Sequence, residues 1–344
     1  MKKIKGLYNL PYAYDLPISQ GMIRKTPEDF VVEEQLGFKP SGSGEHVFLQ
    51  IEKRGENTDY VAGQLARFAE VAKRDIGFAG LKDRHAVTTQ WFSVWLPARS
   101  QPDWSEFYTD SIKLLKVDKH IRKLKRGALS GNNFSIKIRD WQGDTDQTIS
   151  RLKQIKNHGI PNYFGEQRFG HQGRNIDHAL ALFLGAKYKK QLRGIYLSAA
   201  RSYLFNLILS KRVMNQSWNQ AVSGDLMMLD QSGSYFKLEQ QDENIMHRMN
   251  TGKIHPTGAL WGQGNSGLEG VAQEIEQSII NEYRELAEGL ERMGLKNDRR
   301  ALRVNVDSLN WQFFDNQTVE LNFYLPAGSY ATTVLRECFN YKDN

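Results

Sequence analysis

The sequence contains very little cysteine and no long hydrophobic run. Cys338 is the single cysteine among 344 residues, which excludes an internal disulfide and suits a reducing compartment. No uncharged apolar run approaches the roughly 18–20 residues that span a bilayer. The basic segment 1–6 also lacks the apolar stretch of a signal peptide. We therefore expect a cytoplasmic protein with no membrane partner.

Motifs for metal and nucleotide chemistry are also scarce. The eight histidines show no H-E-x-x-H or clustered metal-ligand spacing. Residues 262–267 match the G-x-G-x-x-G fingerprint, but that motif requires a preceding strand, and Pro256 with Gly258 make a poor one. We interpret residues 258–267 as a glycine-rich loop and expect neither a metal nor a cofactor.

Positive charge is in moderate excess. Lysine and arginine total 46 against 39 aspartates and glutamates, a formal net charge of +7. The excess is concentrated in three segments, 113–126, 187–193 and 296–303. Such clusters can follow a phosphate backbone, although a solvated surface explains any single cluster equally well. Together they indicate nucleic acid as a partner.

The hydrophobic pattern changes twice along the chain. Residues 1–140 predict strands at 30–34, 47–51, 90–96, 112–117 and 134–138, with one helix between Asn57 and Gly77. A helix after Asp144 leads into a mostly helical region, with helices at 177–184, 197–214 and 268–293. Strands return after Arg303, and a closing helix follows Ser329 with Cys338 on its apolar stripe. This order indicates a helical segment inserted into a sheet domain.

A charged segment follows an apolar strand at residues 78–91. Asp83 lies there among Lys82, Arg84 and His85, and such neighbouring cations favour the ionised carboxylate. An ionised, positioned carboxylate can act as a nucleophile or a base. A solvated charged turn is the equally weighted alternative.

Several segments, spread in order over nearly the whole chain, resemble the TruD family of tRNA pseudouridine synthases. Residues 79–84, with Ala86, Thr88 and Gln90, resemble the active-site motif of that family. Other resembling segments are 25–33, 132–134, 162–170, 201–206 and 325–332.

The resemblance implies an α+β fold. It predicts a pseudouridine synthase catalytic domain, with a mixed, mainly antiparallel sheet and flanking helices, at residues 1–157 and 304–344. A mostly helical α/β insertion domain is expected at residues 158–303. The reaction rearranges the atoms of its substrate, so no cofactor is implied.

The resemblance also assigns roles to individual residues. Asp83 is implied as the catalytic aspartate, with Lys25 as its ion-pair partner and a possible substrate-binding residue. The uridine pocket is implied to contain Phe30, Asn132, Phe134 and Tyr330, where aromatic rings can stack on an extruded base. Tyr330 stands where we expect phenylalanine, so its hydroxyl needs a hydrogen-bond partner if buried. Lys82, Arg84 and Glu28 are predicted to support the active site.

The implied substrate is tRNA, with tRNA-Glu and uridine 13 as the expected target, and a monomer without an obligatory protein partner is expected. Two routes remain open for the catalytic carboxylate. It can attack C1′ of the sugar directly, or it can remove the C2′ proton so that a glycal forms as intermediate. Two other classes of function are also open. One is a non-catalytic structured-RNA-binding protein or RNA chaperone. The other is a nuclease or glycosidase that pairs Asp83 with Glu28 or Glu166.

Overall fold

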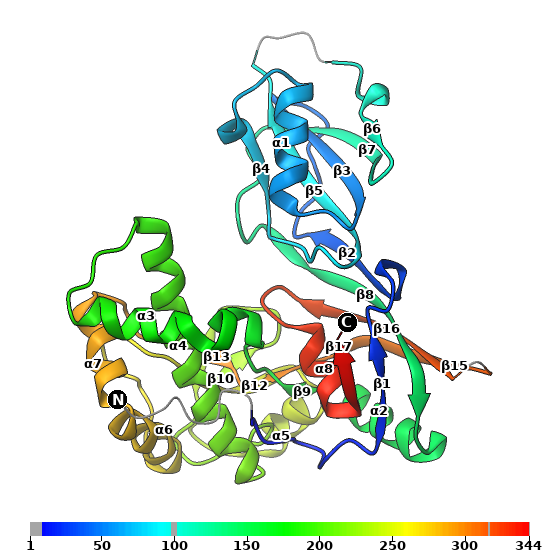
Figure 1. Ribbon diagram of the computed structural model, residues 1–344. Coiled ribbons are helices and arrows are strands. Elements are labelled where there is room, and N and C mark those ends of the chain that lie inside the picture. The colour runs from blue at the N-terminus through cyan, green and yellow to red at the C-terminus, as the bar shows by residue number, and fades with distance from the viewer. Residues whose placement is uncertain (1–8, 98–101, 316, 344) are drawn as a thin grey trace. The chain divides into compact units, whose positions relative to one another are not determined.

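The computed structural model describes residues 9–97, 102–315 and 317–343. These residues form two compact units, each built from separate stretches of the chain (Figure 1). We call them the sheet unit, which contains the described residues of 18–145, 307–328 and 339–343, and the helical unit, which contains 9–17, 146–306 and 329–338. The units therefore differ from the expected domains, because residues 9–17, 146–157, 304–306 and 329–338 group with the middle of the chain.

The sheet unit is built on an eleven-stranded sheet, counted over the described residues. Its main path runs β15-β16-β8-β2-β5-β3-β7-β6, with β1, β4 and β17 attached. Pairs β2–β5 and β1–β17 are parallel and the others are antiparallel, which confirms the predicted mixed, mainly antiparallel sheet. The elements are β1 (Ser19–Ile23), β2 (Phe30–Leu36), β3 (His46–Arg54), α1 (Thr58–Phe68), β4 (Ile76–Phe78), β5 (Val87–Trp95), β6 (Tyr108–Thr109), β7 (Ile112–His120), β8 (Leu129–Gln142), β15 (Asp307–Phe314), β16 (Thr318–Pro326) and β17 (Phe339–Asp343).

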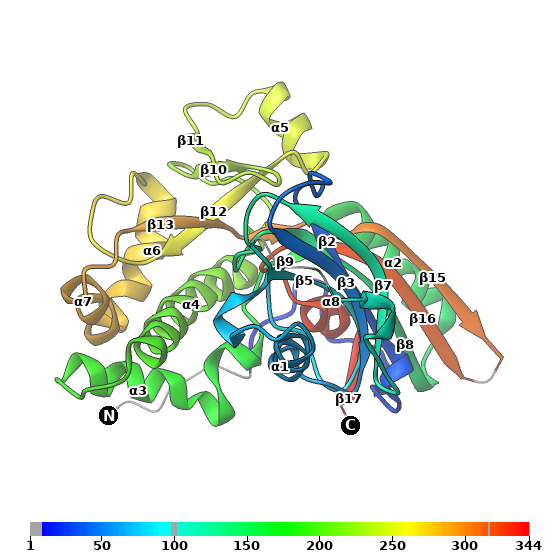
Figure 2. The ribbon, with the colours of Figure 1, turned by 90° about the horizontal axis from the view of Figure 1, so that it is seen from above.

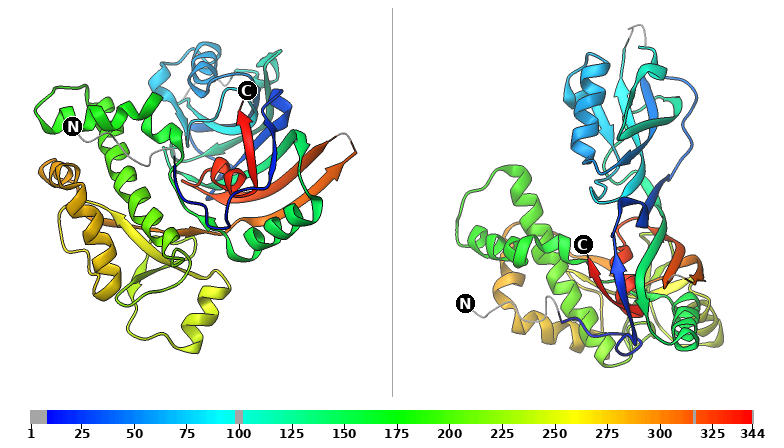
Figure 3. Two further views of the ribbon diagram at one scale, coloured as in Figure 1. Left: turned by 60° about the horizontal axis from the view of Figure 1, so that its bottom comes forward. Right: turned by 45° about the vertical axis from the view of Figure 1, so that its right-hand side comes forward.

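The two ends of the described chain complete this sheet. Strand β17 runs parallel to β1, and Figure 3 shows the two side by side. Helix α1 packs on one sheet face, where Val61 and Leu65 meet Leu49 and Ile51 of β3 in a buried cluster. Apolar alternation in β3 therefore sets the face that α1 covers. The helix ends at Phe68, well before the predicted Gly77, and Glu70 next to this end has a positive φ of 52°.

The helical unit surrounds the long helix α4. Figure 2 shows α4 beside β12, and its buried aromatic residues Tyr203 and Phe205 belong to a hydrophobic core cluster of this unit. The elements are α2 (Thr145–His158), β9 (Ile160–Pro161), α3 (Arg174–Phe183), α4 (Lys190–Met214), β10 (Leu226–Leu229), β11 (Tyr235–Lys237), α5 (Glu243–Asn250), β12 (Ile254–Leu260), α6 (Gly270–Glu282), α7 (Arg284–Arg292), β13 (Asp298–Ala301), β14 (Arg303–Val304) and α8 (Ala331–Cys338). Strands β11-β10-β12-β13 form a sheet.

Three sequence predictions need correction here. The predicted loop 258–267 is wrong at its start, because Gly258 lies inside β12. A Cβ at Gly258 would come within 2.9 Å of Leu302 Cδ2 and 3.2 Å of Phe205 Cε2, so glycine is needed for packing in that strand. The predicted helix 268–293 is two helices, broken at Tyr283 (φ −112°, ψ 40°). Helix α4 begins seven residues before the predicted Leu197, at Lys190.

The expected position of Cys338 agrees with the structure. Cys338 is buried on α8 at 2% exposure, as its place on an apolar stripe predicts. Burial raises the pKa of its thiol, which makes it a poor nucleophile. Over the residues that the structure describes, no helix is both long and apolar enough to cross a membrane.

Candidate active site

Asp83 lies on the loop between β4 and β5, and side chains of three other elements form hydrogen bonds with the main chain of this loop. Gln90 on β5 donates its amide to the Gly80 carbonyl at 2.6 Å. The Thr58 hydroxyl at the start of α1 accepts the Lys82 backbone N–H at 3.0 Å. The Lys53 ammonium on β3 donates to the Asp83 carbonyl, also at 3.0 Å. Three elements of the sheet unit therefore fix the backbone that carries the carboxylate.

The Asp83 side chain forms an ion pair with Arg24. Arg24 Nη2 lies 3.3 Å from Asp83 Oδ2, and the Asp83 side chain is 38% exposed whereas that of Arg24 is 7% exposed. The same guanidinium contacts Asp343 on β17 and lies over the Phe30 ring, 4.0 Å from its centroid. A buried cation thus holds a carboxylate that solvent can reach.

The predicted ion pair between Lys25 and Asp83 is wrong. Lys25 pairs instead with Asp140 at 2.9 Å, and both side chains are exposed. Arg24 has a positive φ of 55°, an unusual backbone conformation for a residue other than glycine. Sequence reasoning missed Arg24, because the sequence alone does not indicate which of the two adjacent cations after β1 contacts the loop that carries Asp83.

The other predicted supporting residues have separate partners. The buried Lys82 ammonium contacts the buried Glu34 carboxylate at 2.6 Å. Arg84 Nε donates to the Gly55 carbonyl at 3.2 Å. Glu28 pairs with Arg54 on the surface, and the hydrogen bond from Arg54 lowers the pKa of Glu28. Lys82 therefore anchors the loop, and Arg24 replaces it as the cation that contacts Asp83.

Lys53 is a second buried cation beneath this loop. It is 0% exposed, and its ammonium donates to the carbonyls of Glu56 and Asp83 at 2.6 and 3.0 Å. Burial lowers the pKa of Lys53 to about 8, against a smaller opposing effect of Asp83. Sequence reasoning missed it, although Lys53 continues the alternation of Val47, Leu49 and Ile51 on the covered face.

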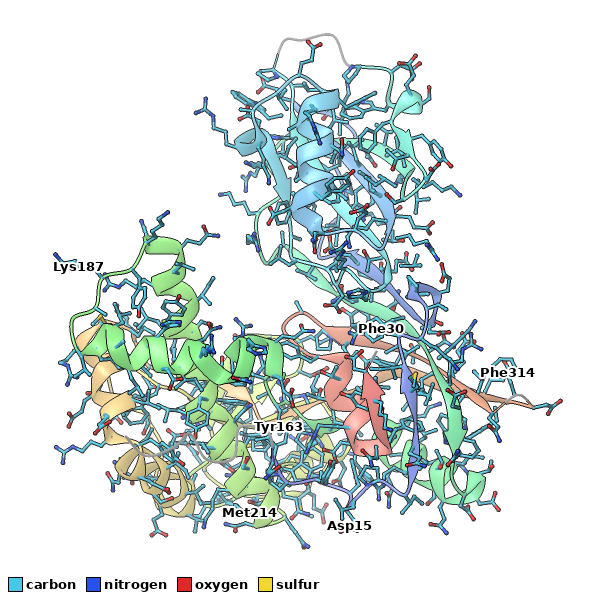
Figure 4. The ribbon with its side chains drawn as sticks, in the orientation of Figure 1. Asp15, Phe30, Tyr163, Lys187, Met214 and Phe314 are labelled. Atoms are coloured by element: carbon cyan, nitrogen blue, oxygen red, sulfur yellow. The ribbon has the colours of Figure 1, made fainter. Side chains whose placement is uncertain are left out.

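Phe30, Asn132 and Phe134 share one face of the sheet. In the antiparallel register of β2 and β8, Phe30 lies opposite Ile136 and Val32 opposite Phe134, so these positions project to the same side. The rings of Phe30 and Phe134 meet edge to face at 6.3 Å. Figure 4 labels Phe30 at the start of β2.

Asn132 supplies a polar group on that aromatic face. Its Oδ1 atom is buried and has no hydrogen-bond partner among the described residues. A buried acceptor without a partner is costly, and a ligand N–H would satisfy it. Phe134 also stacks on Phe323 of β16 at 5.3 Å. Arg24 connects this face to Asp83, because it contacts both Phe30 and the carboxylate.

Tyr330 lies in the helical unit, just before α8. Its hydroxyl accepts from Arg168 Nη2 at 3.0 Å and from Nε at 3.3 Å, which provides the partner that the sequence analysis required. Its ring meets Phe164 edge to face and lies against Gly165, where a Cβ would come within 3.0 Å of Tyr330 Cδ1. Glu166, the other carboxylate of the paired-acid alternative, starts the short helix Glu166–Phe169 in this unit.

Comparison with known proteins identifies the family. The model of the family "tRNA pseudouridine synthase D (TruD)" matches residues 8–189 and 182–338. The chain is 49% identical over 338 residues to tRNA pseudouridine synthase D of Methylococcus capsulatus, covering 98% of this chain and 96% of that protein. It is 46% identical over 336 residues to the protein of the same name from Nitrosococcus oceani, and the match covers 96% of this chain and 94% of that protein.

A solved structure shares the fold. A putative tRNA pseudouridine synthase D from Methanosarcina mazei is 24% identical and superposes with a TM-score of 0.74, covering 98% of each chain. This likeness agrees with the α+β architecture that the family resemblance implies. With the family match over both halves of the chain, the protein belongs to the tRNA pseudouridine synthase D family.

Proposed function

We propose that this chain converts uridine 13 of a tRNA to pseudouridine, with Asp83 as the catalytic carboxylate. The observation that carries the proposal is the Arg24–Asp83 ion pair at 3.3 Å, in which a solvent-accessible carboxylate is held by the guanidinium that also lies over the ring of Phe30. Family membership supports the reaction and the class of substrate, since the matched relatives are named for them.

The reaction conserves every atom of the nucleotide. The N1–C1′ bond breaks, a C5–C1′ bond forms, the C5 proton leaves and N1 gains a proton. Asp83 acts at the sugar, either by attack on C1′ or by removal of the C2′ proton. Its fixed position matters for both routes, because a misplaced reacting group loses much of the rate.

The aromatic face is the proposed support for the uracil. Extruding a base from its stack costs a few kcal/mol, and stacking on an aromatic ring returns about 1–3 kcal/mol per base. We propose Phe30, Phe134 and Tyr330 as the aromatic residues that contact the base. Phe30 is 2% exposed and lies under Arg24, and Phe134 is 9% exposed and stacks on Phe323, so contact of a base with these two rings requires that their neighbours move. The unpartnered Oδ1 of Asn132 suits the N3–H of uracil. The sheet unit is the proposed catalytic domain, and most of the helical unit is the proposed insertion.

The test is to incubate the protein with an unmodified tRNA-Glu transcript and map pseudouridine by carbodiimide treatment and primer extension. A new stop at position 13, with an intact strand and no released uracil, is the expected result. Binding without any modification would favour the RNA-chaperone alternative. Strand scission or free base would favour a nuclease or glycosidase.

We also propose that the protein acts in the cytoplasm as a monomer. Sedimentation of the purified protein tests its oligomeric state.

A further inference from the structure

Two arginines of the helical unit converge on one aromatic ring. The Arg300 guanidinium lies 4.1 Å from the centroid of Phe164, and that of Arg168 lies 5.3 Å from it. Both arginines are half-buried as residues. Burial, and to a lesser degree the neighbouring Arg168, lower the pKa of Arg300 to about 10. Two cations thus lie against the same ring.

The side-chain hydrogen-bond partners of the Arg168 guanidinium are neutral oxygens. Its three nitrogens donate to the hydroxyls of Tyr330 and Ser198, at 3.0–3.3 Å. Across the described parts of the chain, no carboxylate lies within 4.0 Å of this guanidinium. These three hydrogen bonds use three of its five N–H groups, so donor capacity remains for a ligand.

Two other arginines of the same unit, Arg212 and Arg299, have a different environment. Arg212 donates to both oxygens of Asp225 at 3.0 and 2.9 Å, and Arg299 donates to Glu276 at 2.9 Å. Each of these buried charges is therefore neutralised by a carboxylate, the usual arrangement for a buried arginine. Arg201 and Arg303 also lack a carboxylate partner, but they donate to backbone carbonyls and, for Arg303, to His255. Arg168 differs from all of these because it donates only to side-chain hydroxyls.

We infer that Arg168, together with Arg300, binds a backbone phosphate of the RNA beside Tyr330. A phosphodiester supplies the missing negative charge, and the planar guanidinium matches its oxygens in a bidentate manner. This inference rests on the proposed function, because it takes RNA as the ligand. It places a phosphate contact of Arg168 beside Tyr330, the residue that the proposed function assigns to the uridine.

The first test measures RNA binding over a salt series in the Asp83→Asn background, so that the RNA is not modified during the titration. Arg168→Gln keeps hydrogen-bond donors for the two hydroxyls but removes the charge. It should weaken binding of unmodified tRNA about tenfold at 0.1 M salt and reduce the slope of log affinity against log salt by about 0.7–0.9. Arg168→Lys should keep the slope. Arg284→Gln is the matched control, since Arg284 is exposed on α7 and already paired with Glu288 at 2.5 Å.

The second test locates the phosphate. Single neutral methylphosphonates are placed along the tRNA, and each substituted RNA is bound to the Asp83→Asn protein and to its Arg168→Gln derivative. At one position, the methylphosphonate should weaken binding to the Asp83→Asn protein. The same substitution should leave binding to the Arg168→Gln derivative unchanged. An unchanged salt slope for Arg168→Gln, with the same response of both proteins at every position, would overturn the inference. Pseudouridine formation by the wild-type protein tests the proposed function separately.

Discussion

Arg24 and Asp83 lie 59 positions apart in the sequence and form an ion pair in the sheet unit, 3.3 Å between Nη2 and Oδ2. Arg24 also lies over the Phe30 ring, so one buried side chain joins the proposed catalytic carboxylate to the aromatic face. The exposed Lys25, which sequence reasoning favoured, pairs with Asp140.

Replacing Arg24 should therefore affect catalysis more than replacing Lys25. We expect Arg24→Met to lower kcat about 10²-fold, because the carboxylate loses its orienting partner, with little change in the Kd for tRNA. Lys25→Met should have a much smaller effect, since exposed ion pairs contribute about 0–1 kcal/mol. Single-turnover kinetics with saturating protein compare the two, and Lys73→Met controls for loss of a surface charge. A greater loss for Lys25→Met than for Arg24→Met would refute the assigned pair.

The Lys82–Glu34 pair should control the stability of the sheet unit. Both side chains are buried, and Glu34 also accepts the Trp91 backbone N–H at 3.2 Å. Glu34→Ala leaves the Lys82 ammonium uncompensated, which should lower the free energy of unfolding by about 3–5 kcal/mol. Urea denaturation measures this change.

A second variant separates charge from packing in that pair. Glu34→Leu combined with Lys82→Met replaces two buried charges by apolar side chains, and it should recover most of the lost stability. If Glu34→Ala alone changed the free energy of unfolding by less than 1 kcal/mol, the pair would not anchor the loop.

Lys53 should give the stability of the protein a measurable dependence on pH. Its pKa is about 8 in the folded protein, below its ordinary value of 10.5, because it is buried. The unfolded chain therefore binds more protons than the folded one between about pH 8 and 10.5, so this group favours folding more strongly as pH rises through that window. The difference in unfolding free energy between wild type and Lys53→Met should rise with pH there. If this difference did not change with pH, the pKa of Lys53 would not be lowered by folding.

Gly165→Ala should test the contribution of Tyr330. A Cβ there would lie 3.0 Å from Tyr330 Cδ1 and 3.3 Å from Cγ, so the half-buried ring must move by a few tenths of an ångström. We expect near-normal thermal stability, because a half-buried ring can shift, and a reduced kcat/KM for tRNA. The control is Gly63→Ala, at a position on α1 where a Cβ meets nothing within 4 Å. Equal activity of the two variants would remove Tyr330 from the pocket.

The fold was predictable where side-chain alternation is strong. Strand β3 shows Val47, Leu49 and Ile51 on one face, and the structure covers that face with α1. Strand β12 was missed because Gly258 and Pro256 are poor strand formers. The helix α4 packs closely on that strand and requires glycine there, a tertiary cause that local sequence does not reveal.

The candidate site was predictable only in part. The motif around Asp83 and the aromatic positions Phe30 and Phe134 follow from the resemblance, and the shared face of the two rings follows from strand register. The partner of Asp83 depends on the left-handed backbone of Arg24, which no periodicity indicates. Glu34 did leave a signal, because it continues the buried alternation of Phe30 and Val32 as a charged residue.

The most direct test of the account compares Asp83→Asn with wild type under single-turnover conditions on an unmodified tRNA, with pseudouridine mapped at each uridine. Asp59→Asn, an exposed change on α1, serves as the matched control. We predict that Asp83→Asn binds tRNA as wild type does and forms no pseudouridine, while Asp59→Asn remains fully active. Pseudouridine formation by Asp83→Asn at a rate near that of wild type would contradict the account.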